Sequence, residues 1–172
     1  NYTHQFEKNV AWSTTLNYTK GDGYYEQYKR NKELTAYGLE SPVIIDGEEI
    51  TESDAIIRKY MENYYLVLAS DVKYSTDKLN FVGGIYLSRY DGDHFGKAIW
   101  SAVLGDYYDY GSVKNWYNNN GLKQEANAFA RVEYSPLDWL TAYIDLQYRG
   151  VFLNMSGPDD DGYSLDYKHS WN

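Results

Sequence analysis

The sequence predicts an all-β fold, an antiparallel meander that forms part of a transmembrane β-barrel. Three observations indicate this. Stretches of about ten residues alternate apolar and polar side chains, as strands with one apolar face do. Very short turns and very long aromatic loops alternate between these stretches, as periplasmic turns and extracellular loops do in outer-membrane barrels. Aromatic residues lie near both ends of the apolar faces, where Tyr and Trp favour the membrane interface.

Five strands account for the alternation, and we expect them to be antiparallel and paired in sequence order. The clearest is 139–149, in which Ile144 falls on the apolar face and Gln147 on the polar face. A shift of one residue exchanges the two faces of a strand, so this assignment is specific. The expected strands are 10–19, 62–75, 79–90, 124–135 and 138–151.

The connections differ in length at the two ends of these strands. Turn-forming residues predict short turns at 75–78 and 135–138, on one edge of the sheet. A third tight turn at 7–9 would follow the end of an earlier strand at 2–6. The remaining connections, from Lys20 to Asn63, from Tyr90 to Lys123 and after Val151, are expected to be long loops.

The two faces of the predicted sheet have different compositions. The apolar face should meet lipid through two aromatic girdles: Trp12, Tyr74, Phe81 and Tyr134 at the short-turn end, and Tyr18, Tyr64 and Tyr148 at the long-loop end. The polar face should line the lumen, with charges paired to Arg131 and Arg149. Its predicted members are Asn127, Arg131, Asp145, Gln147 and Arg149. Soluble sheets also alternate, so a soluble secreted β-sandwich that binds carbohydrate through Tyr and Trp is the alternative.

Composition narrows the range of functions. The chain has 172 residues, enough for one domain, and its net charge of −9 argues against a nucleic-acid partner. It contains no cysteine, and no run of about 18 apolar residues that would form a transmembrane helix. Membrane barrels have at least about eight strands. We therefore expect residues 1–172 to be part of the barrel domain of a longer chain.

Several local motifs carry further predictions. Gly21 and Gly23 should mark the point where a strand leaves the sheet, and Thr51 or Ser53 should cap a helical turn. The segment 90–96 favours a turn. Its two aspartates and His94 have too few ligands at the right spacing for a calcium or zinc site, so no metal or other cofactor is expected.

No nucleophile, phosphate loop or dinucleotide motif is visible, and the chain is not expected to be an enzyme. A membrane-barrel enzyme is therefore only the third possibility. Loops on a rigid scaffold carry binding sites, and aromatic rings stack on sugars or planar chelates. The ligand-binding candidates in the expected loops are Tyr24, Tyr25, Tyr28, His94, Trp100, Tyr107, Tyr108 and Trp116.

Four segments resemble TonB-dependent outer-membrane receptors of the Bacteroidetes type: LNYTKGDGYYEQYK (16–29), AIIRKYMENYY (55–65), YDGDHFGKAIW (90–100) and DLQYRGV (145–151). The resemblance implies an internal fragment of a barrel of about 22 strands whose lumen holds a plug domain. It also implies a bacterial outer-membrane location and import of a scarce ligand, such as a siderophore, haem, cobalamin or glycan. Outer-membrane lipid, the receptor's own plug and, through the plug, TonB would be partners.

Overall fold

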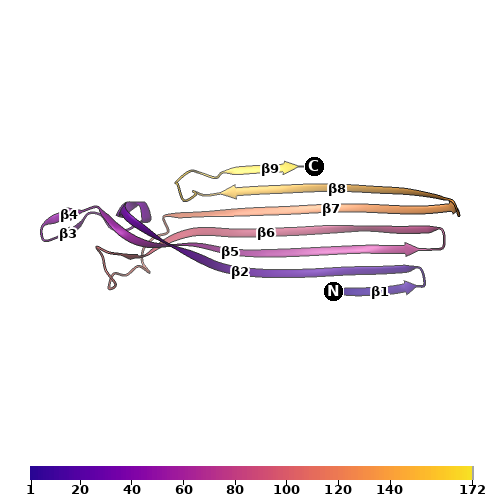
Figure 1. The fold of residues 1–172 in the computed structure, drawn as a ribbon, viewed down its shortest axis with the longest axis horizontal. Coiled ribbons are helices and arrows are strands. Elements are labelled where there is room, and N and C mark those ends of the chain that lie inside the picture. Colours follow the sequence, from indigo (N-terminus) through magenta and orange to yellow (C-terminus); the bar gives the residue numbers. More distant parts are fainter. Residues whose placement is uncertain (172) are drawn as a thin grey trace.

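The computed structural model describes residues 1–171, and most of them belong to one open antiparallel sheet (Figure 1). The sheet order is β1-β2-β5-β6-β7-β8-β9. Its strands are β1 (Tyr2–Glu7), β2 (Val10–Glu33), β5 (Glu52–Ser75), β6 (Leu79–Ser101), β7 (Tyr117–Leu137), β8 (Leu140–Ser156) and β9 (Tyr167–Trp171). Outside this sheet lie a 3-10 helix, η1 (Leu34–Tyr37), and a small hairpin, β3 (Val43–Ile45) and β4 (Glu48–Ile50).

The predicted meander is confirmed. Each strand of the large sheet pairs with its neighbour in the chain, apart from the β3–β4 excursion between β2 and β5. The turns after β1, β5 and β7 all lie on one edge (Figure 1). The last of these turns is at 138–139 rather than 135–138, because β7 continues through a register shift between Tyr134 and Leu137.

The predicted lengths of the strands are wrong, because the strands continue far into the segments expected to be loops. β2 and β5 each have 24 residues, and β6 and β7 have 23 and 21. Gly21 and Gly23 do not end β2; they pair with Asn63 and Met61 of β5. Tyr-rich sequence has a high strand propensity, and continuous pairing with β5 keeps both glycines extended. At the long-loop end, the segments that leave the sheet between these four strands are 34–51 and 102–116.

The helical turn predicted at Thr51 or Ser53 is also absent, because β5 begins at Glu52. Ser53 instead bridges two segments of the long-loop end. Its hydroxyl accepts a hydrogen bond from the backbone N–H of Val103 at 3.2 Å and lies 3.2 Å from the hydroxyl of Ser101. A short polar side chain that satisfies a distant backbone group therefore replaces the expected cap.

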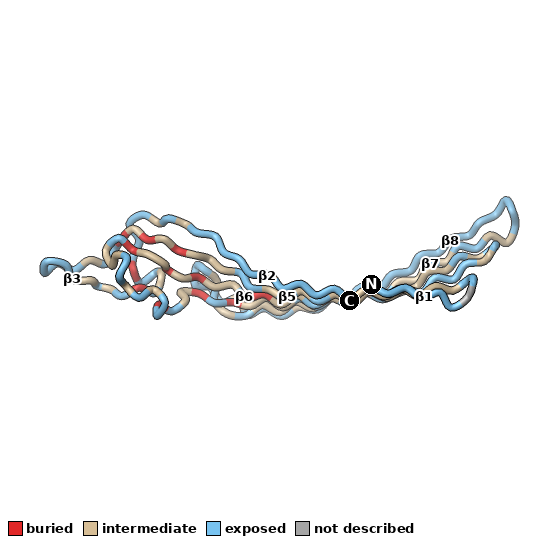
Figure 2. The backbone as a smooth tube through the Cα atoms, turned by 90° about the horizontal axis from the view of Figure 1, so that it is seen from below, coloured by how far each residue is buried: buried red, intermediate tan, exposed pale blue. Residues whose placement is uncertain are grey.

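Buried residues gather at the long-loop end, as Figure 2 shows along the curved sheet. Leu34, Leu39, Ala98 and Val113 form a small core in which η1 and the 102–116 loop pack on β6. The turn-side half of the sheet is a single layer with no buried hydrophobic residue among those described. Its apolar side chains are therefore available to an environment outside the chain.

Candidate functional site

The register of the sheet gathers the apolar residues of five strands on one side, here called the apolar face. Leu16 lies opposite Leu68, Leu68 opposite Leu87, Leu87 opposite Ala126, and Ala126 opposite Gly150. Residues directly opposite in an antiparallel pair point to the same side. The other side, here called the polar face, carries Gln147 and its partners. The alternation seen strand by strand is thus a property of the whole sheet.

The turn-side border of the apolar face is oblique to the strands. Val10 and Tyr74 are level with each other and with Phe81, but the apolar face of β6 begins two residues nearer the turns, at Leu79. Leu79 is level with Tyr134. From β2 to β8, the residues that form this border are Val10, Tyr74, Leu79, Tyr134 and Leu140.

Leu140 continues the displacement, because Tyr134 is level with Ala142 and Leu140 lies two residues nearer the turns. The long-loop border is less regular, because it moves two residues away from the turns at β5 and four residues toward them at β6. From β2 to β8 its residues are Tyr18, Tyr64, Leu87, Ala126 and Tyr148. The next residues on the same face are polar in the first four strands, namely Lys20, Glu62, Arg89 and Gln124; in β8 the face continues through Gly150 to Phe152.

The turn-side border makes this apolar band cross the sheet at an angle. It moves by about four residues over the four steps from β2 to β8, or about one residue per strand. With a rise of about 3.4 Å per residue and strands about 4.8 Å apart, the strands tilt by about 35° from the normal of the band. Strands of membrane barrels tilt by about 35–45°.

All seven aromatic residues predicted for the girdles lie on the apolar face. Within the band, Leu16 is 67% exposed and Leu146 is 66% exposed, so the chain itself does not cover them. A single-layer sheet buries such side chains only against something else. Among the described residues the one α- or 3-10-type element is η1, and none of their helices is long and apolar enough to cross a bilayer.

The predicted polar set shares the polar face, and two ion pairs link β7 to β8 there. Arg131 donates to Asp145 through Nη2 at 2.8 Å, and Arg149 lies 2.9 Å from Glu125. The expected partner of Arg149 was not specified by the sequence; the structure identifies it as Glu125. Both arginines are more than half exposed, so these pairs add little to stability.

A concave surface lies on the polar face, near the long-loop end. It is a cavity of about 510 Å³ formed where two rows of paired residues cross β2, β5, β6 and β7. One row contains Met61, His94 and Asn119, and the other contains Tyr25, Lys59 and Tyr117. The cavity is therefore lined by aromatic rings, an ammonium, an imidazole and an amide. Such a lining suits a ligand with flat and polar parts.

Two features close this polar-face cavity. Gly96, between Lys59 and Tyr117, leaves room for aromatic rings, because a side-chain carbon there would lie 2.3 Å from Trp116. The loop at 157–166 is tied across the other end, since Lys59 donates to Asp160 and Asn119 donates to the carbonyl of Pro158 at 3.1 Å. The hydrogen bond from Lys59 lowers the pKa of the Asp160 carboxyl.

Only three of the eight predicted ligand-binding residues line this cavity: Tyr24, Tyr25 and His94. All eight were expected in loops, but five of them lie on strands. These are Tyr24, Tyr25, Tyr28, His94 and Trp100. The ring of Tyr24 also lies tilted against that of Tyr60, with centroids 5.4 Å apart, and the guanidinium of Arg58 lies 4.3 Å from the Tyr24 ring centroid.

The other five serve the long-loop end itself. Tyr28 donates to Asp54, and Trp100 donates to Asp106 at 2.8 Å. Trp116 packs edge-on against Tyr37, and Tyr108 packs edge-on against Tyr110. Burial raises the pKa of Tyr108, Tyr110 and Tyr37. Only Tyr107 stands fully in solvent.

Sequence reasoning missed Lys59, Met61, Tyr117, Asn119 and Asp160. The signal that identifies the first four is register, because Tyr25 and His94 each stand in a row with two of them. That register becomes visible only if the strands are extended past residues 19 and 90. Asp160 comes from a loop 101 residues along the chain from Lys59, and no local pattern points to it.

The aspartates of the 90–96 segment do not converge with His94. The segment is part of β6, so Asp91 and Asp93 lie on the apolar-face side and His94 on the polar face. One amide nitrogen of Asn120 donates to both aspartates at 2.8 Å. His94 is therefore separate from the two aspartates, which share one amide partner. Comparison with protein-family models and with curated proteins found no match to this chain.

Proposed function

We propose that this chain is part of the wall of an outer-membrane β-barrel, with the apolar face on lipid and the polar face toward the lumen. The observation that supports this best is the oblique apolar band. Its turn-side border shifts by about one residue per strand, as a membrane slab does across tilted strands. A sandwich would need a second layer over the apolar face, and none is present among the described residues.

The edges of the sheet agree with a larger wall. β1 pairs only with residues 10–14 of β2, and β9 pairs only with residues 151–155 of β8. The remaining edges of β2 and β8 pair with no described strand. Open edges inside a membrane leave backbone groups without partners, so barrels close them. Further strands on both sides would complete such a closure.

Within this proposal the barrel is a TonB-dependent receptor that imports a scarce ligand through its plugged lumen. Resemblance supports this finer step, together with the position of the polar-face cavity. That cavity lies beyond the apolar band on the long-loop side, where an extracellular ligand would arrive. A siderophore, haem, cobalamin or glycan offers flat surfaces for Tyr25 and Tyr117 and polar groups for His94 and Asn119.

The membrane proposal is tested by extraction of the full-length protein from cells. A barrel stays with the outer-membrane fraction in alkaline or urea washes and is released by detergent as a species whose gel mobility changes on boiling. Recovery of a monodisperse protein without detergent would instead support the soluble carbohydrate-binding sandwich. Transport is tested separately, by uptake of candidate ligands in cells with and without a functional TonB.

A further inference from the structure

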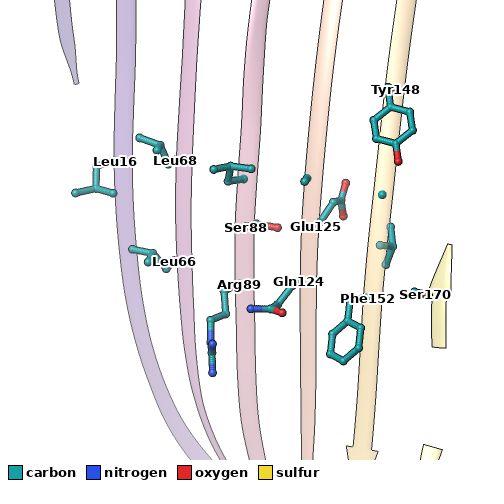
Figure 3. Close-up of a pocket in the computed structure, with 14 residues that line it drawn as sticks. Leu16, Leu66, Leu68, Ser88, Arg89, Gln124, Glu125, Tyr148, Phe152 and Ser170 are labelled. Carbon is teal, nitrogen blue, oxygen red and sulfur yellow. The ribbon is translucent and has the colours of Figure 1, made fainter. Parts of the chain in front are cut away.

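An open groove on the apolar face is a concave surface that the lipid-facing assignment does not explain. Its volume is about 640 Å³, and it lies at the long-loop border of the band (Figure 3). Leu16, Leu66, Leu68 and Leu87 line one part of it. Ala126 and Gly150 then lower the floor between these leucines and the larger Tyr148 and Phe152. The hollow therefore comes from small residues between large ones.

The long-loop end of this groove is polar. Arg89 and Gln124 lie opposite each other there, directly beyond Leu87 and Ala126 on the same face. Figure 3 shows the side chain of Arg89 extending along β6, away from the leucines and toward the long loops. Lys20 on β2 adds a second cation two residues nearer the long loops, level with Asp91, with its ammonium 5.6 Å from the ring centroid of Tyr64.

Arg89 is held in place by hydrogen bonding, but most of its N–H donors are not engaged by that contact. Its Nη2 donates to Asp91 at 2.9 Å, and Asp91 in turn accepts from Asn120 at 2.8 Å. Among the described residues this is the one ion pair that Arg89 forms, and its side chain is 52% exposed. A guanidinium has five N–H donors, so most of them can reach a further anion. Arginine binds phosphate oxygens in pairs, which suits this exposed, oriented group.

We propose that this groove binds a phosphorylated acyl lipid of the leaflet on the long-loop side. An acyl chain occupies the leucine-lined floor over Ala126 and Gly150, and the phosphate contacts Arg89, with Gln124 as a neutral donor. This inference rests on the membrane proposal above and adds a specific ligand to it. The apolar length and the cationic end match the two parts of such a lipid in the order that the leaflet presents them.

The test is native mass spectrometry of the full-length detergent-purified protein, titrated with phosphatidic acid and, separately, with diacylglycerol of the same acyl chains. We expect bound phosphatidic acid to exceed bound diacylglycerol by about tenfold in apparent affinity, the effect of one charge-assisted contact. Arg89→Gln should remove this preference. Ala126→Phe should fill the floor and weaken both lipids.

Arg131→Gln is the matched control. Arg131 is 58% exposed and pairs with one aspartate, as Arg89 does, but it lies on the polar face. It should leave the preference unchanged, and inorganic phosphate should not displace the lipid. Equal lipid binding by Arg89→Gln and wild type, or equal loss in both arginine variants, would overturn the lipid site. A protein that needs no detergent would overturn the membrane proposal instead.

Discussion

The two halves of the long strands differ in what surrounds them, although the same chain forms both. On the turn side, β2 alternates apart from Thr14 and leaves Leu16 and Tyr18 exposed. Beyond Tyr18 the same strand becomes polar and tyrosine-rich, and nearby segments build a small core around Leu34 and Val113. A strand that crosses from one solvent to another would change in this way. The hydrogen-bond ladder continues unchanged, while the side chains follow the surroundings.

The sharpest way to break this comparison is to place a charge on each face of the turn-side half. Ile144→Arg should destabilise the membrane-inserted barrel by about 2–4 kcal/mol, because the charge would sit in lipid. Gln147→Arg, three residues along on the polar face, should cost far less. Folding of the full-length protein into lipid vesicles, followed by urea titration, measures both. Equal costs at the two positions would contradict the assignment of the faces.

The long-loop half should respond to a change in its small core instead. Leu34 is almost fully buried, so Leu34→Ala should destabilise the packing of η1 and 102–116 by about 2 kcal/mol, the lower end of the range for such truncations. Ile44, exposed in β3, offers a matched control for truncation. Limited proteolysis should show faster cleavage near 102–116 for Leu34→Ala only. If Leu34→Ala instead sped up cleavage throughout the chain to the same extent, the two halves of the sheet would unfold together and the comparison would fail.

The strand pairings explain how much of this was predictable. The fifth strand was recognisable because Leu140, Ile144 and Leu146 alternate with polar residues in a single surface. The extensions beyond Lys20 and Tyr90 were not, because both of their faces are mixed and glycine–aspartate pairs there usually form turns. Pairing with neighbouring strands overrides that local preference. The polar-face cavity, which is built from rows of residues across four strands, therefore could not be predicted from the sequence of each strand alone.

A smaller effect is expected from substitutions in the polar-face cavity, which compare residues inside the cavity with one outside it in the same long-loop half. Tyr25→Ala or His94→Ala should weaken ligand binding by about tenfold each, since each removes one aromatic or polar partner. Tyr107→Ala should have no effect, because Tyr107 stands in solvent outside the cavity. Uptake and surface expression should be measured together in cells. Point variants suit this test better than deletion of 100–118, which would remove the buried Ser101, Val113 and Tyr117.

The smallest expected effect concerns the loop at 157–166, which closes the polar-face cavity through Asp160. Its carboxyl has a lowered pKa because Lys59 donates a hydrogen bond to it. The tether should therefore be complete above the ordinary aspartate pKa of about 4 and weaken only as the pH falls through the lower value in the folded protein. Between pH 7 and 5 nothing should change. The effect is modest because Asp160 is partly exposed.

A spin label at position 163 can follow this loop, since Tyr163 is exposed and the chain has no cysteine to compete with Tyr163→Cys. Label mobility should rise only at acidic pH in the otherwise unchanged protein. Asp160→Asn should raise it at every pH and remove the acid transition. Asp161→Asn, one residue along, is the matched control and should keep the transition. A rise in mobility centred near neutral pH would contradict the assignment of the tether to Asp160.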